Sequence, residues 1–313
     1  MSIFKNLINS KKPILTEGAI IERLSREYKL KLDDYIANSA LIYDNSSKVI
    51  LQNIYKQYID IAYNHNTPIM IFAPTWRLSN NRIMQSDYHD KNLNYDCCKF
   101  LDKIKYDYHD FSENIFIGGL LGCKGDAYKP DEALDAINSF NYHKKQISKL
   151  NETNIDYLFA ATLPAFSEAY GIAKAMALYS KPYIISFIID ENGCLLDGTN
   201  LSYAIQKIDN EISQAPICYM INCVHPTTLK KALKKETITY PEITERLIGI
   251  QGNTSKKTPN ELNDSIELDT QNAELFTKDI IELYENYQIR ILGGCCGTDQ
   301  THIQSIANFI SKL

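Results

Sequence analysis

The stretch that decides the fold of this chain is Arg290-Ile291-Leu292-Gly293-Gly294-Cys295-Cys296-Gly297-Thr298. A short apolar run that stops in a glycine-rich turn is typical of a buried strand at its carboxyl end. Two adjacent cysteines can hardly form a disulfide with each other without strain. In a glycine turn at a strand end, however, both thiols can face one cation, so the stretch predicts a strand that carries metal ligands.

A third cysteine has a similar setting upstream. Cys223 closes the apolar run 217–223 and is followed by Pro226, which suits the first turn of a helix. Three thiolates with one open position are typical of a catalytic zinc site, so we predict that Cys223, Cys295 and Cys296 bind Zn²⁺. The alternative for any cysteine pair is a small apolar residue of the core, and Cys97-Cys98, which has no glycine beside it, fits that alternative.

Short apolar runs recur along the whole chain, and helical patterns separate nearly all of them. The runs cover residues 13–17, 68–74, 115–121, 155–162, 183–189, 217–223, 247–251 and 289–293. They are almost continuously apolar, as in parallel strands that are covered on both faces. Eight strand and helix units predict an α/β fold of the (β/α)8 TIM barrel type. Since no repeat or low-complexity linker interrupts the pattern, we expect a single domain over residues 1–313.

Helical spacing and caps support this interpretation. Apolar side chains at Ile50, Ile54, Tyr58 and Ile61 share one helix face, and either Thr298 or Asp299 is suited to cap the last helix. Two connections exceed the usual loop length, residues 78–113 and the polar segment 253–271. We interpret the second as a mobile lid over the functional end of the barrel.

Composition excludes several classes of protein. The 33 basic and 38 acidic residues give a net charge of −5, so there is no general basic field for nucleic acid. The first residues lack the apolar core of a signal peptide, and no run is long enough to span a membrane. We therefore expect a cytoplasmic protein whose 8 cysteines are thiols or metal ligands. The sequence does not indicate an oligomeric state.

Several motifs together resemble one family. They are Leu15-Thr16-Glu17-Gly18-Ala19, Ala73-Pro74-Thr75-Trp76, Tyr142-His143 with Gln146, Asn222-Cys223 with His225-Pro226, Gln251-Gly252-Asn253-Thr254, and the Gly-Gly-Cys-Cys-Gly-Thr motif. In this respect the chain is similar to the homocysteine S-methyltransferase family, nearly from end to end. The resemblance implies a (β/α)8 barrel with zinc on the three cysteines and an enzyme of methionine biosynthesis.

The expected partners are a small-molecule thiol acceptor, homocysteine first, and a cationic methyl donor. The donor would be S-adenosylmethionine, S-methylmethionine or a betaine-like compound, because we expect no appended domain for folate or cobalamin. An anionic site of three thiolates deprotonates the acceptor yet leaves its sulfur nucleophilic, since nucleophilicity falls as the pKa falls. Methyl transfer then needs orientation but no obligatory general acid.

Polar residues at other strand ends are candidates for binding the substrate. These are Glu17, for an ammonium group, together with Thr75, Asn222 and Asn253, while Trp76 is a candidate for the face of a methylated cation. Each has a structural alternative. The threonine and the asparagines could be turn formers, and Glu17 could be an exposed partner of Arg23 or Lys12.

One position departs from the family pattern. Where the fourth strand of the family typically ends in Phe-Glu-Thr, this chain has Ala161 in place of the glutamate. Either Glu17 or Glu168 compensates, or the acceptor lacks the usual amino-acid group. This leaves two alternatives open, a zinc barrel that acts on another small thiol, selenol or methylated amine, and a non-catalytic binding paralogue.

Overall fold

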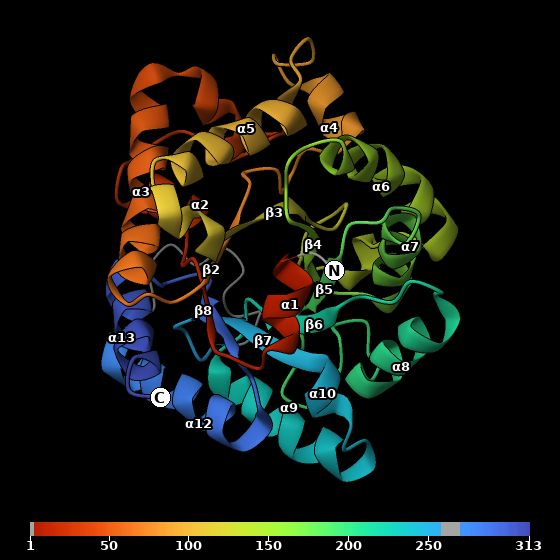
Figure 1. Ribbon diagram of the computed structural model, residues 1–313. Coiled ribbons are helices and arrows are strands. Elements are labelled where there is room, and N and C mark those ends of the chain that lie inside the picture. The colour runs from red at the N-terminus through yellow and green to blue at the C-terminus, as the bar shows by residue number, and fades with distance from the viewer. Residues whose placement is uncertain (1–2, 258–269) are drawn as a thin grey trace.

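A closed barrel of eight parallel strands in chain order forms the centre of the computed structural model, which describes residues 3–257 and 270–313 (Figure 1). Its strands are β1 (Ile14–Thr16), β2 (Ile69–Phe72), β3 (Ile115–Leu121), β4 (Tyr157–Leu163), β5 (Tyr183–Phe187), β6 (Cys218–Asn222), β7 (Leu247–Gly252) and β8 (Ile291–Gly294). The barrel closes where Leu15 of β1 lies opposite Leu292 of β8. Each apolar run expected from the sequence overlaps one strand, so the prediction of a (β/α)8 barrel is confirmed.

Helices surround the strands in the described part of the chain. They are α1 (Ile3–Asn9), α2 (Ile21–Arg26), α3 (Asn45–Asn64), α4 (Asn80–Gln85), α5 (Leu93–Tyr106), α6 (Ala136–Asn151), α7 (Phe166–Met176), α8 (Leu201–Glu211), α9 (Pro226–Thr239), α10 (Ile243–Arg246), α12 (Ala273–Tyr287) and α13 (Gln300–Ile310), with 3-10 turns η1 (Asn38–Tyr43), η2 (His109–Asn114) and η3 (Pro130–Glu132). Pro226 begins α9, and the Asp299 carboxylate caps α13 by accepting from Thr301 and His302. Both helix starts are where the sequence predicted them.

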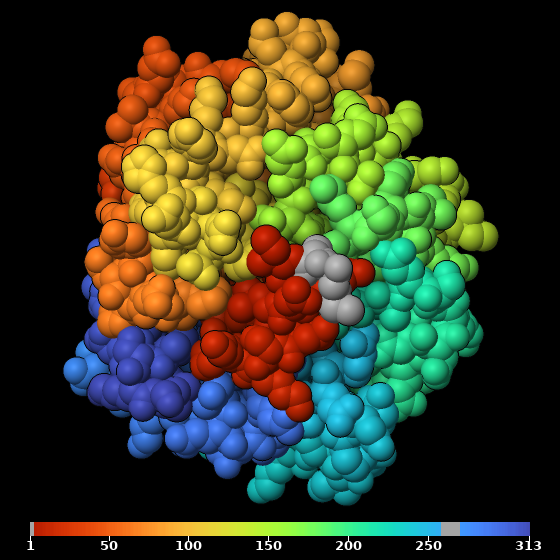
Figure 2. All heavy atoms as spheres, in the orientation of Figure 1, coloured from red at the N-terminus to blue at the C-terminus, as the bar shows by residue number. Residues whose placement is uncertain are grey.

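The barrel interior is filled with large apolar side chains. Phe72, Phe116, Tyr157 and Phe159 meet there, and Phe4 of α1 stacks on Tyr157 with ring centroids 4.3 Å apart. Figure 1 shows α1 lying across this end of the barrel, and Figure 2 shows the same segment at the centre of one molecular face. Since Phe116 and Tyr157 stand at the amino ends of their strands, α1 covers the amino-terminal end of the barrel. The chemistry is left to the opposite end.

The structure describes one of the two long connections in full and the other only in part. Residues 78–113 fold into α4, α5 and η2, and Cys97 and Cys98 are buried in the core on α5, as the structural alternative predicted. The predicted lid falls largely on residues 258–269, which lie outside the described part of the chain. Within residues 3–257 and 270–313, no helix combines the length and apolar character needed to cross a membrane.

Candidate functional site

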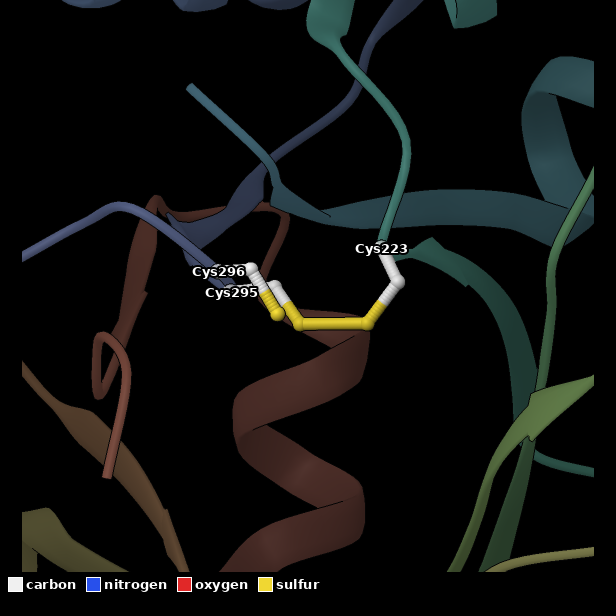
Figure 3. A group of neighbouring side chains, drawn as sticks. All are labelled: Cys223, Cys295 and Cys296. Carbon is white, nitrogen blue, oxygen red and sulfur yellow. A yellow bond between two sulfur atoms is a disulfide. The ribbon is translucent and has the colours of Figure 1, made fainter. Parts of the chain in front are cut away.

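Three cysteine sulfurs from two separate strand ends meet at the carboxyl end of the barrel. Cys223 follows the last residue of β6, and Cys295-Cys296 follow the last residue of β8, with β7 between these strands. The three Sγ atoms all lie within 4.8 Å of one another (Figure 3). Cys223 and Cys295 are joined as a disulfide with their Cα atoms 5.5 Å apart, and Cys296 is a free thiol beside them. We call this group the thiol cluster.

An unusual backbone conformation places the first of these cysteines. Cys223 has a φ of 58°, in the left-handed region that residues other than glycine seldom adopt. Its N–H donates to the Gln251 carbonyl at 3.1 Å, and its carbonyl accepts from Asn253 Nδ2 at 3.0 Å. These bonds to the end of β7 hold the turn. Residues kept in such conformations by their surroundings are concentrated at functional sites.

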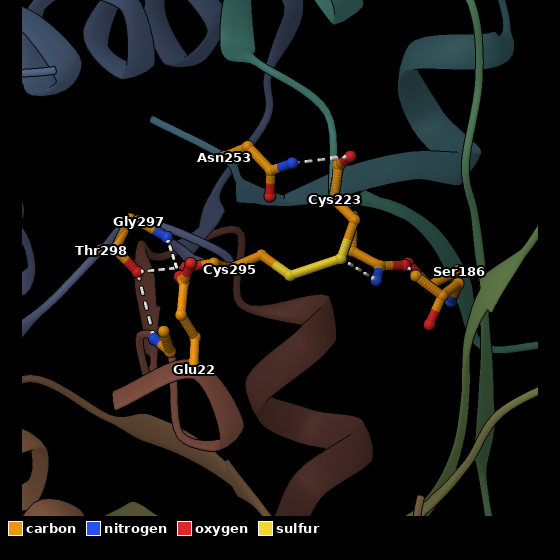
Figure 4. The surroundings of a disulfide bond; sticks show 10 residues. Glu22, Ser186, Cys223, Asn253, Cys295, Gly297 and Thr298 are labelled. Atoms are coloured by element: carbon orange, nitrogen blue, oxygen red, sulfur yellow. Dashed lines mark hydrogen bonds between the residues drawn. A yellow bond between two sulfur atoms is a disulfide. The ribbon is translucent and has the colours of Figure 1, made fainter. Parts of the chain in front are cut away.

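The turn that carries the other two cysteines is fixed by the connection between β1 and α2 and by α2 itself (Figure 4). Thr298 Oγ1 donates to the Cys295 carbonyl at 2.6 Å and accepts from the Ala19 N–H at 3.1 Å. The Glu22 carboxylate accepts from the Gly297 N–H. Gly297 has a φ of 81°, and a side chain there would also collide with Thr254, so glycine is required.

Asn222 supports the cluster from the strand end itself. Its Oδ1 accepts from the Thr162 N–H at 2.9 Å and from Ser186 Oγ at 2.7 Å, which ties together β4, β5 and β6. Its Nδ2 donates to Cys223 Sγ at 3.4 Å. A donor aimed at sulfur stabilises the thiolate over the thiol.

The donor set fits a soft metal ion. Three thiolates this close would repel one another, so their joint ionisation requires a cation. Tetrahedral zinc with Zn–S bonds of about 2.3 Å holds its sulfurs about 3.8 Å apart, which lies within the 4.8 Å that bounds the sulfur separations in the cluster. Cys223 and Cys295 can contribute only after their disulfide is reduced, so the disulfide and the metal site are alternatives for the same sulfurs. In reduced form the cluster could bind a metal ion.

A cavity of about 270 Å³ opens beside the thiol cluster. Its wall is mostly apolar, and the side chains relevant here are Glu17, Glu22, Trp76, Tyr128, Ala161, Asn222 and the three cysteines. A small, largely apolar cavity with a few convergent polar groups at this end of a barrel is the expected form of a substrate site.

Glu17 is the buried carboxyl group of this cavity. It is 6% exposed and accepts from the Phe72 N–H at 2.9 Å. Burial raises the pKa of Glu17 well above its usual range, and the bond from Phe72 opposes this shift only in part. Arg23 instead pairs with Glu27 at 2.8 Å, so Glu17 is not the exposed ion-pair partner that one alternative suggested.

The sequence profile described as homocysteine S-methyltransferase matches residues 14–310, nearly the whole chain. The chain belongs to the homocysteine S-methyltransferase family. This methyltransferase is 27% identical over 236 residues to homocysteine S-methyltransferase 1 of Saccharomyces cerevisiae, covering 68% of each chain. It is 26% identical over 203 residues to homocysteine S-methyltransferase YbgG of Bacillus subtilis, covering 62% of this chain and 59% of that protein.

A solved structure shares the fold. The homocysteine methyltransferase MmuM from Escherichia coli, in its metallated form, superposes with a TM-score of 0.76 over 98% of this chain and 99% of that chain. Its oxidized form gives a TM-score of 0.77 over 99% of this chain and 100% of that chain. At 17% identity for both forms, this likeness concerns the fold alone.

The remaining predicted residues of the methyltransferase differ in their access to the cavity. Trp76 lines it, and the Arg77 guanidinium lies over the indole ring, 4.1 Å from its centroid. Thr75 is fully buried, and its Oγ1 donates to the Leu120 carbonyl at 2.6 Å and accepts from the Leu120 N–H at 3.1 Å. Asn253 is 1% exposed and is engaged with Cys223. Thr75 and Asn253 are therefore placed to brace the site from behind its wall.

The second proposed replacement for the family glutamate is excluded. Ala161 lies in the cavity wall, as the motif predicted. Glu168, however, is fully buried on α7 and accepts hydrogen bonds from His143 and from the backbone of Lys124 and Leu134. It does not line the cavity, so Glu17 is the remaining candidate of the two.

Glu22 and Tyr128 are among the cavity residues that sequence reasoning missed. Tyr128 follows a strand end after several glycines, a signal that could have marked a loop returning to the site. The glycines themselves serve packing, because Gly118 leaves space for the Tyr157 ring and Gly122 leaves space for Trp76.

Proposed function

We propose that this methyltransferase transfers a methyl group from a cationic donor to the thiolate of homocysteine, with Zn²⁺ held by Cys223, Cys295 and Cys296. The observation that carries the proposal is the convergence of these three sulfurs beside a small cavity at the carboxyl end of the barrel. When bound, the zinc ion would supply a thiolate at neutral pH and leave it nucleophilic. The product would be methionine.

The residues around the cluster prepare it for this chemistry. Asn222 donates to Cys223 Sγ and so favours the ionised ligand. The hydrogen bonds at Cys223 and at the Cys295 turn hold the sulfurs in place before any substrate arrives. Once the disulfide is reduced, a backbone that is already held in place loses less free energy in positioning the reactants.

Glu17 is proposed to receive the ammonium group of the acceptor. Burial raises the pKa of Glu17 because it penalises the charged carboxylate. An incoming ammonium group would supply a partner for that charge and would lower the pKa again. With Ala161 in the wall, Glu17 would carry this recognition without a second carboxylate from β4.

The donor is proposed to be a sulfonium or quaternary ammonium compound, such as S-adenosylmethionine, S-methylmethionine or a betaine-like compound. An anionic cluster attracts a methylated cation, and the apolar wall suits its methyl groups. Trp76 presents an indole to the cavity, although Arg77 already lies over that ring. We therefore expect the contribution of Trp76 to come from shape and apolar contact more than from a cation–π interaction.

We further propose that the chain acts as one domain in the cytoplasm. Three thiols that must stay reduced to bind a metal suit a reducing compartment. Contacts between β1 and β8 join residues from both ends of the described chain in one barrel.

The test compares the wild type with Cys223→Ser, Cys295→Ser and Cys296→Ser. Metal content would be measured by elemental analysis after purification under reducing conditions, and methionine formation from L-homocysteine with each donor. We expect near-stoichiometric zinc in the wild type, and loss of both metal and turnover in each variant. Cys194→Ser is the matched control, because this partly exposed free cysteine belongs neither to the thiol cluster nor to the cavity wall. Turnover in the three variants equal to that of the wild type would exclude the mechanism.

A further inference from the structure

Residues 122–135, which we call the cover segment, connect β3 to α6 and return to the cavity. Two side chains from elsewhere hold its backbone. Arg77 Nη1 donates to the carbonyls of Cys123 at 3.0 Å and Gly125 at 2.7 Å. Glu168 accepts from the Lys124 N–H at 2.7 Å through one oxygen and from the Leu134 N–H at 3.4 Å through the other. One carboxyl group thus ties both ends of the cover segment.

The Glu168 carboxyl group is buried, and both of its oxygens accept hydrogen bonds. Glu168 is 0% exposed, and it also accepts from Nε2 of His143, which is 1% exposed, at 2.8 Å. A buried carboxyl group is costly unless its oxygens are satisfied, and here three donors from two elements satisfy it. Such an arrangement is expected where a loop must be held in one conformation.

The cover segment presents Ala127 and Tyr128 to the cavity. Tyr128 is half-buried, and its N–H donates to Asp126 Oδ1 at 2.9 Å, which orients the residue. Tyr128 lines the same cavity as Cys296 and Glu17, and its phenol carries an O–H group that can donate a hydrogen bond.

The polar groups of the cavity have complementary tasks. The acceptor proposed above carries a thiol, an ammonium group and a carboxylate. The thiol cluster suits the thiol, and Glu17 suits the ammonium group. Tyr128 lines the same wall and can donate a hydrogen bond, so it suits the carboxylate.

We propose that Tyr128 determines specificity by donating a hydrogen bond to the carboxylate of the amino-acid acceptor, and that Glu168 is the positioning residue that holds Tyr128 over the cavity. This inference rests on the proposed function, since it names a contact within the same acceptor site. Glu168 itself touches no substrate and acts through the cover segment.

The experiment measures equilibrium binding to the zinc-loaded protein by the fluorescence of Trp76, the only tryptophan in the chain, which lies in the same cavity. The ligands are L-homocysteine and 3-aminopropanethiol, which keeps the thiol and the amine but lacks the carboxylate. For Tyr128→Phe we expect about a tenfold or greater loss of affinity for homocysteine, the range for a hydrogen bond to a charged group. The affinity for 3-aminopropanethiol should change less than twofold.

Glu168→Gln should weaken homocysteine binding in the same selective way. In the double variant with Tyr128→Phe, the loss should equal that of Tyr128→Phe alone, which a merely structural effect would not produce. If Glu168→Gln does not fold, His143→Asn removes one of the three donors and tests the same coupling. Tyr170→Phe and Glu211→Gln, a bonded pair at the outer surface, are the matched controls and should leave both affinities unchanged.

Unchanged homocysteine affinity in Tyr128→Phe, or equal losses for both ligands, would overturn the role of Tyr128. Additive losses in the double variant would overturn the positioning role of Glu168. If the wild type binds neither ligand, the proposed function fails, and with it this inference. If the wild type binds homocysteine and forms methionine, and Tyr128→Phe binds homocysteine with the same affinity, the inference fails but the proposed function stands.

Discussion

Asn222 directs its amide nitrogen at the sulfur of Cys223, 3.4 Å away, while the oxygen of the same amide is bonded to β4 and β5. One side chain thus connects the frame of the barrel to a metal-ligand candidate. Partners of this kind are needed to orient ligands and tune their charge.

Replacing Asn222 by aspartate should weaken metal binding. The substitution removes the donor to Cys223 Sγ and adds an anion beside thiolates that already repel one another. We expect a 10- to 100-fold loss of zinc affinity, roughly the effect of altering such partners in other metal sites. Competition with a chromophoric chelator measures it. Asn308→Asp, an exposed position on α13, is the control, and a similar loss in both variants would contradict a local effect.

Formation of the Cys223–Cys295 disulfide should compete with metal binding. Because Cys223 and Cys295 are joined in the structure, the sulfurs that a metal requires can instead pair with each other. We expect a mild disulfide-forming oxidant to release the metal and to remove two titratable thiols, and a reductant to restore both. Thiol titration and metal release would be followed together. Metal release without a loss of titratable thiols would argue against competition for the same sulfur atoms.

Glu17→Gln should change how stability depends on pH. The pKa of Glu17 in the folded protein lies well above the ordinary value of 4.5, so the folded state binds more protons than the unfolded state above that pH. The unfolding free energy of the wild type should therefore fall relative to the variant as pH rises from about 4.5 through the folded pKa, by at most about 1.4 kcal/mol per pH unit. Denaturant unfolding of both proteins at several pH values measures the difference. Parallel profiles would show that the carboxyl group is not penalised by burial.

Phe4→Ala should destabilise the fold without affecting the site. Phe4 is 2% exposed and stacks on Tyr157 inside the barrel, so truncation leaves a cavity that costs about 3–5 kcal/mol. Because α1 covers the end of the barrel opposite the thiol cluster, homocysteine affinity under native conditions should stay within twofold. Ile3→Ala, at a side chain 64% exposed, is the control and should cost less than about 0.5 kcal/mol.

The barrel and the proximity of its three cysteines could be predicted from the sequence. Continuous apolar runs indicated parallel strands, and parallel strands of a closed barrel place all their carboxyl ends on one side. Cys223 and Cys295-Cys296 could then be predicted to lie close together, because only β7 separates their strands. Side chains that follow directly from strand ends inherit their position from the barrel.

Residues whose position depends on a loop could not be placed in the same way. Tyr128 lies in a loop whose backbone is bonded to Arg77 and Glu168, and no local sequence pattern shows such contacts between distant segments. Thr75 stands at a strand end as expected, but its hydroxyl is engaged by Leu120 of the neighbouring strand. Strand-end position predicts which side chains are near the site, but hydrogen bonding decides which of them face it.

The spread of the thiol cluster along the chain has a consequence for biosynthesis. Cys223 and Cys295 are 72 residues apart, and the second of them follows the strand that seals the barrel against β1. A nascent polypeptide that has not yet emerged past Gly294 holds one ligand of three and cannot retain a zinc ion tightly. Metal acquisition would therefore follow translation of the final strand, and zinc occupancy would report that maturation is complete.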